Sequence, residues 1–132
     1  MNTTNTTKAS GQKPRADINE KTREFSIRVI KMAKFLKKDN NDHPLIDEVV
    51  FHGTRIGASL YAGRHGGKTA FLEGNKAALH YAHITKYYID LMYSIADINK
   101  EQYDSLNNDI RAIINIFGAI IKKLQENMYQ RH

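Results

Sequence analysis

The sequence predicts an all-α protein whose four helices form an up-down-up-down antiparallel bundle. Apolar residues recur at helical spacing through four long segments, and no segment alternates apolar and polar residues as a strand would. The connections between the segments are short, so consecutive helices are expected to be antiparallel neighbours. A chain of 132 residues suits one domain with one core. We place the bundle in residues 16–128, with polar tails at 1–15 and 129–132.

The strongest helical pattern lies in residues 99–124, and the other helices are expected to pack around it. Its apolar side chains recur three or four residues apart over about seven turns, without an interrupting proline. Asn99 is the expected N-cap, because its short side chain can accept a hydrogen bond from an amide of the first turn. The apolar face is wider than one partner helix requires, so we expect burial on more than one side. Its members are Tyr103, Leu106, Ile110, Ile113, Ile114, Phe117, Ile120, Ile121 and Leu124.

Two further helices are predicted at 17–38 and 44–61, separated by a turn that ends in Pro44. Proline suits the first turn of a helix, where its missing N–H costs nothing. Gly53 and Gly57 lie four residues apart on one face of the second segment, and they predict a close approach by another helix. The expected core positions are Ile18, Phe25, Val29, Met32, Ala33 and Leu36, then Ile46, Val49, Val50, Ile56 and Leu60.

The remaining helix is predicted at 69–96, after a glycine-rich break at 63–67. The expected buried stripe consists of Phe71, Leu72, Ala78, Tyr81, Ile84, Tyr88, Leu91, Met92 and Ile95. On the opposite side, Lys76, His80, His83, Tyr87 and Asp90 form a polar stripe that we interpret as a surface or a subunit interface. This helix therefore completes the bundle.

Composition excludes some classes of function and favours one class of partner. The chain contains no cysteine, which rules out disulfides, thiolate metal sites and a cysteine nucleophile. No apolar run approaches the ~20 residues that a membrane span needs, and the polar N-terminus is no signal peptide. We expect a cytoplasmic protein without a cofactor. The net charge of +6 favours a polyanionic partner such as RNA or DNA.

The clearest basic feature is a stripe on the first predicted helix. Arg28, Lys31, Lys34 and Lys38 lie three or four residues apart, so they share one side of the helix. Like charges at this spacing repel one another, and a stripe kept despite that cost suggests a polyanion, although long lysines also keep a helix face solvated. Four further basic residues are candidate nucleic-acid contacts: Arg64, Lys68, Lys122 and Lys123.

Two motifs resemble a phosphate-binding loop and a metal site, but we interpret neither as a site of that kind. Residues 62–69 fit a loose phosphate-binding loop, with Ala62 in place of its first glycine and Lys68 positioned to reach outer phosphates. That loop normally joins a strand to a helix, and no strand precedes it here, so we interpret it as a glycine hinge with a basic patch. His80 and His83 lie one turn apart, but no Glu-x-x-His pair completes a metal site. We predict no catalytic residue and no metal ligand.

Three stretches give the chain a family resemblance. Residues 52–58, His-Gly-Thr-Arg-Ile-Gly-Ala, are similar to the Ser-Gly-Thr-Ser-Ile-Gly-Ala stretch of proteins encoded by intervening sequences within bacterial 23S ribosomal RNA genes. Residues 98–103, Ile-Asn-Lys-Glu-Gln-Tyr, resemble the start of the last helix in those proteins and in a second branch of the same superfamily. That branch comprises the accessory variability determinant proteins of diversity-generating retroelements, and residues 116–122 resemble its Met-Leu-Gly-Gly-Trp-Ile-Lys ending.

The chain also departs from both branches. The intervening-sequence branch carries a polar network of Arg, Asn and Glu, and the matching positions here are Phe51, Ser59, Ala62, Tyr81 and Ile84. Ile120 stands where the accessory branch has its tryptophan. The loss of the polar network moves the sequence toward the accessory branch.

The resemblance implies a four-helix bundle assembled into a ring-shaped homopentamer. It also implies a basic, non-enzymatic accessory protein that binds nucleic acid and a reverse transcriptase. The alternative is an intervening-sequence-type bundle with a structural or interaction role. A third reading, an enzyme that uses residues 66–69, is the least favoured.

Overall fold

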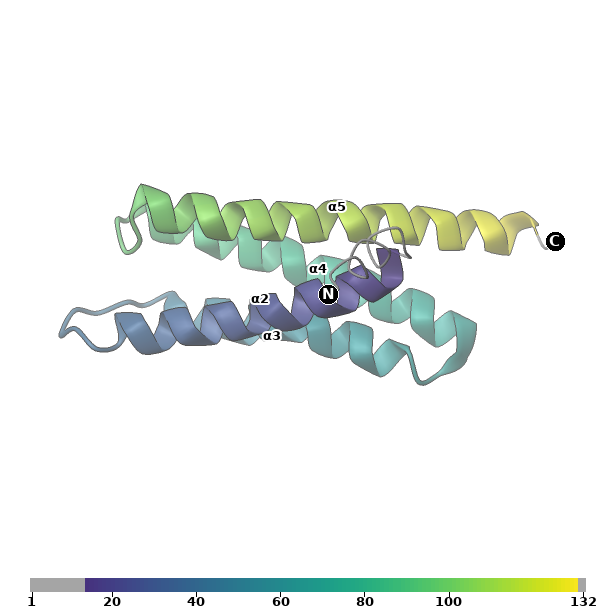
Figure 1. The fold of residues 1–132 in the computed structure, drawn as a ribbon, viewed down its shortest axis with the longest axis horizontal. Coiled ribbons are helices and arrows are strands. Elements are labelled where there is room, and N and C mark those ends of the chain that lie inside the picture. Colours follow the sequence, from purple (N-terminus) through teal and green to yellow (C-terminus); the bar gives the residue numbers. More distant parts are fainter. Residues whose placement is uncertain (1–13, 131–132) are drawn as a thin grey trace, which may run out of the picture.

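The computed structural model describes residues 14–130, which form four α helices (Figure 1). They are α2 (Pro14–Leu36), α3 (Ile46–Gly63), α4 (Gly67–Ser94) and α5 (Lys100–Gln130). Helix α2 packs against α3 and α5, and α4 packs against the same two helices. No strand occurs in the described part of the chain. The prediction of an all-α protein with four helices is confirmed.

The helices differ from their predicted bounds mainly at the two chain ends. Helix α5 continues six residues past Leu124 to Gln130, beyond the predicted end of the domain at 128. No helix breaker separates the two positions, and Gln, Glu and Met are good helix formers. Helix α2 begins at Pro14, where a proline is tolerated, and ends at Leu36 rather than at 38. Residues 1–13, most of the predicted N-terminal tail, lie outside the described residues.

The core combines apolar residues from all four helices, and most of the predicted positions are buried. Helix α4 is the exception. Its fully buried face includes Asn75, Ala82, Thr85 and Ile89, whereas Ile95 is 50% exposed. The predicted stripe followed the large apolar side chains, whereas the fully buried positions also include smaller side chains such as Thr85, which lies against Gly53 of α3.

A pair of glycines marks the closest approach of α3 and α4. A Cβ atom on Gly63 would lie 2.9 Å from the carbonyl oxygen of Ala70 and 3.0 Å from the Cα of Gly74. A Cβ on Gly74 would lie 2.8 Å from the carbonyl oxygen of Ser59. The approach predicted at Gly53 and Gly57 is looser than this crossing. A Cβ on Gly57 would lie 3.3 Å from Thr22 Oγ1 and 3.5 Å from the Thr22 carbonyl oxygen of α2, and the three atoms nearest a Cβ on Gly53 belong to side chains, at 3.4–3.6 Å. Only glycine fits the α3–α4 crossing.

Short hydrogen-bonded caps define the turn between α4 and α5. Asn99 is the N-cap, as predicted: its Oδ1 accepts from the Gln102 amide at 2.8 Å, and Gln102 Oε1 accepts from the Asn99 amide at 2.8 Å. Before it, Ala96 adopts a positive φ of 64°. The Asp97 amide donates to the Met92 carbonyl at 2.9 Å, which closes α4 with a Schellman motif.

None of the four described helices combines the length and the apolar character that crossing a membrane requires.

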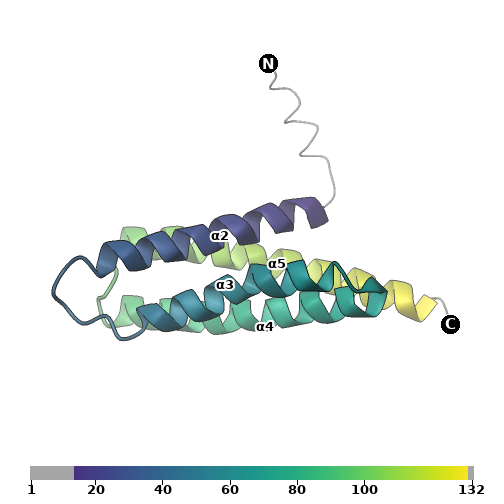
Figure 2. The same ribbon diagram turned by 90° about the horizontal axis from the view of Figure 1, so that it is seen from below.

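Figure 2 shows the same helices after a turn about the long axis, with α5 reaching past the turn that joins α3 to α4. The α2–α3 loop and the α3–α4 turn lie at opposite ends of the molecule (Figure 1).

Candidate nucleic-acid interface

The outer face of α2 carries free cations. Lys31 and Lys34 are exposed on the helix, and Lys38 is exposed in the turn that follows it. Within residues 14–130 none of the three forms an ion pair, whereas the neighbouring Lys37 pairs with Asp47 at 2.8 Å. Three of the four predicted stripe residues therefore present unneutralised charge to solvent.

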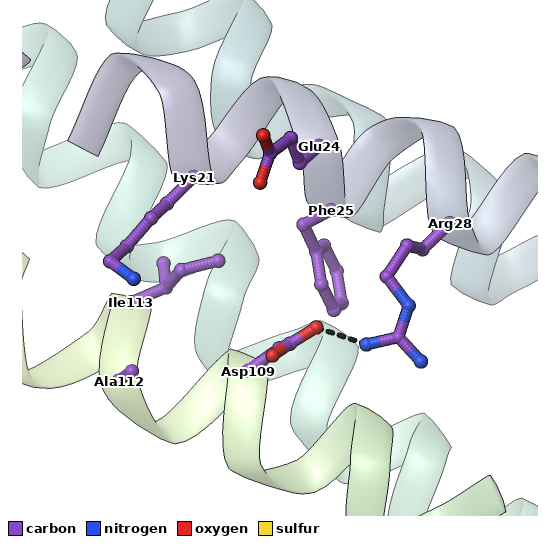
Figure 3. A pocket seen from close by; sticks show the side chains of 7 residues that line it. All are labelled: Lys21, Glu24, Phe25, Arg28, Asp109, Ala112 and Ile113. Carbon is purple, nitrogen blue, oxygen red and sulfur yellow. Dashed lines mark hydrogen bonds and ion pairs between the residues drawn. The ribbon is translucent and has the colours of Figure 1, made fainter. Parts of the chain in front are cut away.

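Arg28, the fourth member of the predicted stripe, has a different role. Its guanidinium pairs with Asp109 of α5 (Figure 3). It also donates to Ser105 Oγ at 2.9 Å. The side chain is 39% exposed. Because Asp109 balances its charge, Arg28 fastens α2 to α5 rather than adding to the free basic surface.

A groove runs between α2 and α5 on both sides of Arg28. Figure 3 shows its smaller part, a hollow of about 90 Å³ in which Phe25 and Ile113 lie beneath the charged side chains of Lys21 and Glu24. The larger part has a volume of about 310 Å³. It is lined by Arg28, Lys31, Met32, Phe35, Gln102 and Leu106. Apolar packing between α2 and α5 is therefore incomplete along this seam.

Phe35 is the residue of this groove that the sequence reading left out. It is 61% exposed, although phenylalanine usually finds cover. The available signal was its position four residues after Lys31, on the polar side of the first helix. Recognising the groove itself also required the pairing of α2 with α5, which no local pattern shows.

The other four predicted contacts lie elsewhere. Arg64 is exposed in the α3–α4 turn, with its guanidinium carbon 5.0 Å from the ring centre of Tyr61, and Lys68 is exposed in the first turn of α4. Lys122 and Lys123 are exposed in the last third of α5. That end of the molecule is remote from the α2–α3 loop (Figure 1). The eight predicted residues do not form one continuous surface.

A histidine clasp joins the two loops at the groove end of the bundle. His43 Nε2 lies 2.9 Å from Asp39 Oδ1 in the α2–α3 loop, and His43 Nδ1 lies 3.3 Å from Asp97 Oδ1 in the α4–α5 turn. The hydrogen bond that Asp39 accepts raises the pKa of His43, and the negative charges of Asp39 and Asp97 add to the effect. The pKa of Asp39 is lowered, first by the Asn41 amide and then by His43. The clasp holds the end of α2 near the start of α5.

A polar network fixes α4 against α5 on the other side. Lys86 Nζ donates to Asp90 at 3.0 Å and to Asn107 Oδ1 at 3.0 Å. The Tyr103 hydroxyl donates to Asp90 at 2.8 Å, and this bond to a carboxylate raises the pKa of Tyr103. Asp90, predicted to be a surface residue, therefore serves this helix contact.

The two rejected motifs have plain structural settings. His80 and His83 are exposed on α4, and within residues 14–130 no three His, Asp or Glu side chains come together as ligands for a metal ion. Residues 62–69 span the end of α3, the short turn after it and the start of α4, and Gly67, the first residue of α4, adopts a φ of 87°. A left-handed glycine between two helices fits the predicted hinge.

Comparison with known proteins finds a structural relative. No family model matches the chain, and no curated protein matches it. Among solved structures, the chain is similar to a protein of unknown function from the S23 ribosomal protein family of Bacteroides thetaiotaomicron. The TM-score is 0.79 at 28% sequence identity, over 83% of this chain and 99% of the other. The match is compatible with the superfamily that the sequence resembles, and it leaves the branch open.

Proposed function

We propose that this protein is a non-enzymatic, nucleic-acid-binding accessory protein. The observation that carries the proposal is the set of exposed lysines on α2, Lys31, Lys34 and Lys38, which have no acidic partner among the described residues. Phosphate groups would supply the missing negative charge, and their counterions would be released on binding. The net charge of +6 favours the same class of partner.

A salt titration tests this proposal. Labelled RNA and DNA are titrated with the protein and followed by fluorescence anisotropy from low to physiological salt, using the unchanged chain and a variant with Lys31, Lys34 and Lys38 changed to Gln. Arg28 stays unchanged, because its loss would loosen α2 from α5. Binding should weaken steeply with salt, and the variant should show a shallower slope, by about 2 if all three lysines meet phosphates of a single strand.

Lys76 provides the matched control. It is also an exposed helical lysine, on α4, and its nearest carboxylate oxygen belongs to Glu73 at 3.7 Å. Lys76→Gln should leave the affinity and the slope unchanged within error. No binding at low salt by the unchanged protein, or an unaltered slope in the triple variant, would reject α2 as the nucleic-acid surface.

We further infer that the helices follow an up-down-up-down order and that five copies close into a ring. Each helix packs against its neighbours in the chain, and successive connections lie at opposite ends (Figure 1). The last third of α5 leaves apolar side chains uncovered: Met128 is 37% exposed and Tyr129 is 79% exposed. Closed cyclic symmetry would bury such a surface. Light scattering should give about five times the 15.1 kDa of one chain, and a clean monomer would refute the ring.

The proposed protein partner is a reverse transcriptase of a diversity-generating retroelement, on the strength of the accessory-branch resemblance. The similarity to a protein from the S23 ribosomal protein family favours a second candidate, an intervening-sequence-type bundle with a structural or interaction role. The gene neighbourhood separates the two. A reverse-transcriptase gene beside a template repeat supports the first, and a ribosomal RNA gene supports the second.

A further inference from the structure

We propose that the larger part of the α2–α5 groove takes one unpaired base of a single-stranded nucleic acid. The strand's phosphates would follow the exposed lysines of α2. This inference rests on the proposed nucleic-acid binding and adds the class of ligand, a single strand of RNA or DNA rather than a duplex.

The size and lining of the groove fit a flat aromatic ligand. Its volume of about 310 Å³ is at the lower end of the range for small-molecule sites. Met32 and Leu106 supply an apolar surface, and Phe35 supplies an aromatic side chain that is 61% exposed. Bases stack on such rings without regard to sequence, because every base has a π-face.

The polar groups of the groove suit a base and its phosphate. Lys31 lies at the groove and carries no partner charge within residues 14–130, so it can meet a phosphate while the base enters. Gln102 uses its Oε1 to accept from the Asn99 amide. Its NH₂ group remains a donor for an acceptor on a base edge. Arg28 is held by Asp109 and Ser105, which fixes the guanidinium that separates the two parts of the groove.

The local charge at the groove favours a polyanion over a second copy of the chain. None of the residues that line the larger part of the groove carries a carboxylate, and Lys31 and Lys34 leave its surroundings positive. In the smaller part, Asp109 is balanced by Arg28, and Glu24 shares the lining with Lys21. A second copy of the proposed ring would have to bring an acidic surface to this groove to match that local charge. A polyanion brings that negative charge with it. A duplex satisfies the charge equally well, but its bases are already stacked and paired, so only a single strand can offer a base face to Phe35.

The test compares four ligands and two phenylalanine variants. The ligands are a labelled single strand of RNA, its DNA equivalent, the DNA strand with abasic sites and the DNA duplex. We expect the single strands to bind about 5- to 150-fold more tightly than the abasic strand, the range set by one stacked base. Phe35→Leu should remove this preference while keeping the salt slope and the duplex affinity. Phe51→Leu, on α3, is the matched control, since Phe51 is also 47% exposed, and it should bind as the unchanged protein does.

The outcomes separate this inference from the proposed function. No binding to any ligand would overturn both. Binding of intact and abasic strands with equal affinity, unchanged in Phe35→Leu, would overturn the base site and leave phosphate binding on α2 standing. A Phe35→Leu variant that keeps its base preference but loses molar mass in light scattering would show that a second copy covers the groove. Circular dichroism checks that each variant is folded.

Discussion

The α3–α4 glycine crossing gives the sharpest test of the packing. In Gly74→Ala the new methyl group would lie 2.8 Å from the Ser59 carbonyl oxygen and 2.9 Å from the Gly63 Cα. Both are backbone atoms, so neither can rotate away. To restore ordinary contact the two helices must separate by about half an ångström, a gap that forfeits a quarter or more of each dispersion contact nearby.

The magnitude follows from two opposing terms. Alanine is a better helix former than glycine by about 0.8–1 kcal/mol, which favours the variant. Overpacking in a close contact costs about 1–3 kcal/mol, which opposes it. The net effect of Gly74→Ala is therefore a destabilisation of up to about 2 kcal/mol, or a fall in Tm of up to roughly 6 °C for a chain of this length.

Gly118 supplies the control with the opposite sign. It lies inside α5, is exposed, and a Cβ there would meet nothing within 4 Å. Gly118→Ala should therefore stabilise by about 0.5–1 kcal/mol through helix propensity alone. Urea unfolding followed by circular dichroism, at one protein concentration because assembly shifts apparent stability, measures both variants. A Gly74→Ala variant that is stabilised as much as Gly118→Ala would refute the close crossing.

Three further predictions concern the rest of the bundle. Gly57→Leu should lower the free energy of unfolding by about 1–3 kcal/mol by overpacking against Thr22, and an unchanged urea midpoint would mean that α3 does not present Gly57 to α2. Ala96→Gly should raise the free energy of unfolding by about 0.5–1 kcal/mol, since glycine adopts a φ of 64° without strain. A lower Tm would contradict the left-handed cap at this position. The pKa of His43 is raised in the folded state, so the protonated side chain stabilises the fold. This stabilisation is complete below the unfolded pKa, near 6.5, and is lost as the pH rises through the folded pKa. Tm should therefore fall with pH in that window, and it should fall less in His43→Gln.

The sequence predicts local features well, because their causes are local. The four helices, most of the core and the Asn99 cap follow from side-chain spacing and from the chemistry of single residues. The sequence pattern misidentifies several buried residues of α4, because periodicity favours large apolar side chains as core positions. Close packing against α3 instead selects Ala82 and Thr85, and the Gly63–Gly74 contact depends on two segments whose pairing the chain does not spell out.

Charge shows the same division between local and distant causes. Helical spacing correctly places Arg28 beside the lysines, but Asp109 lies 81 residues further along the chain and takes Arg28 out of the free basic surface. Neutralisation by a distant carboxylate cannot be inferred from periodicity. The structure therefore sorts the predicted stripe into one cation that joins helices and three that remain free for a ligand.

The residues at the contact between α2 and α5 are not those that would stabilise the fold most. A partly exposed ion pair such as Arg28–Asp109 contributes at most about 1 kcal/mol, and apolar side chains at this position would close the groove and stabilise more. Elsewhere the bundle is close-packed, down to glycine contacts. The same chain packs α3 tightly on α4 but leaves Phe35 exposed at this groove, beside lysines that have no acidic partner among the described residues. Such local departures are expected at functional sites, which is why this groove, rather than the glycine-rich loop, is where we expect the ligand.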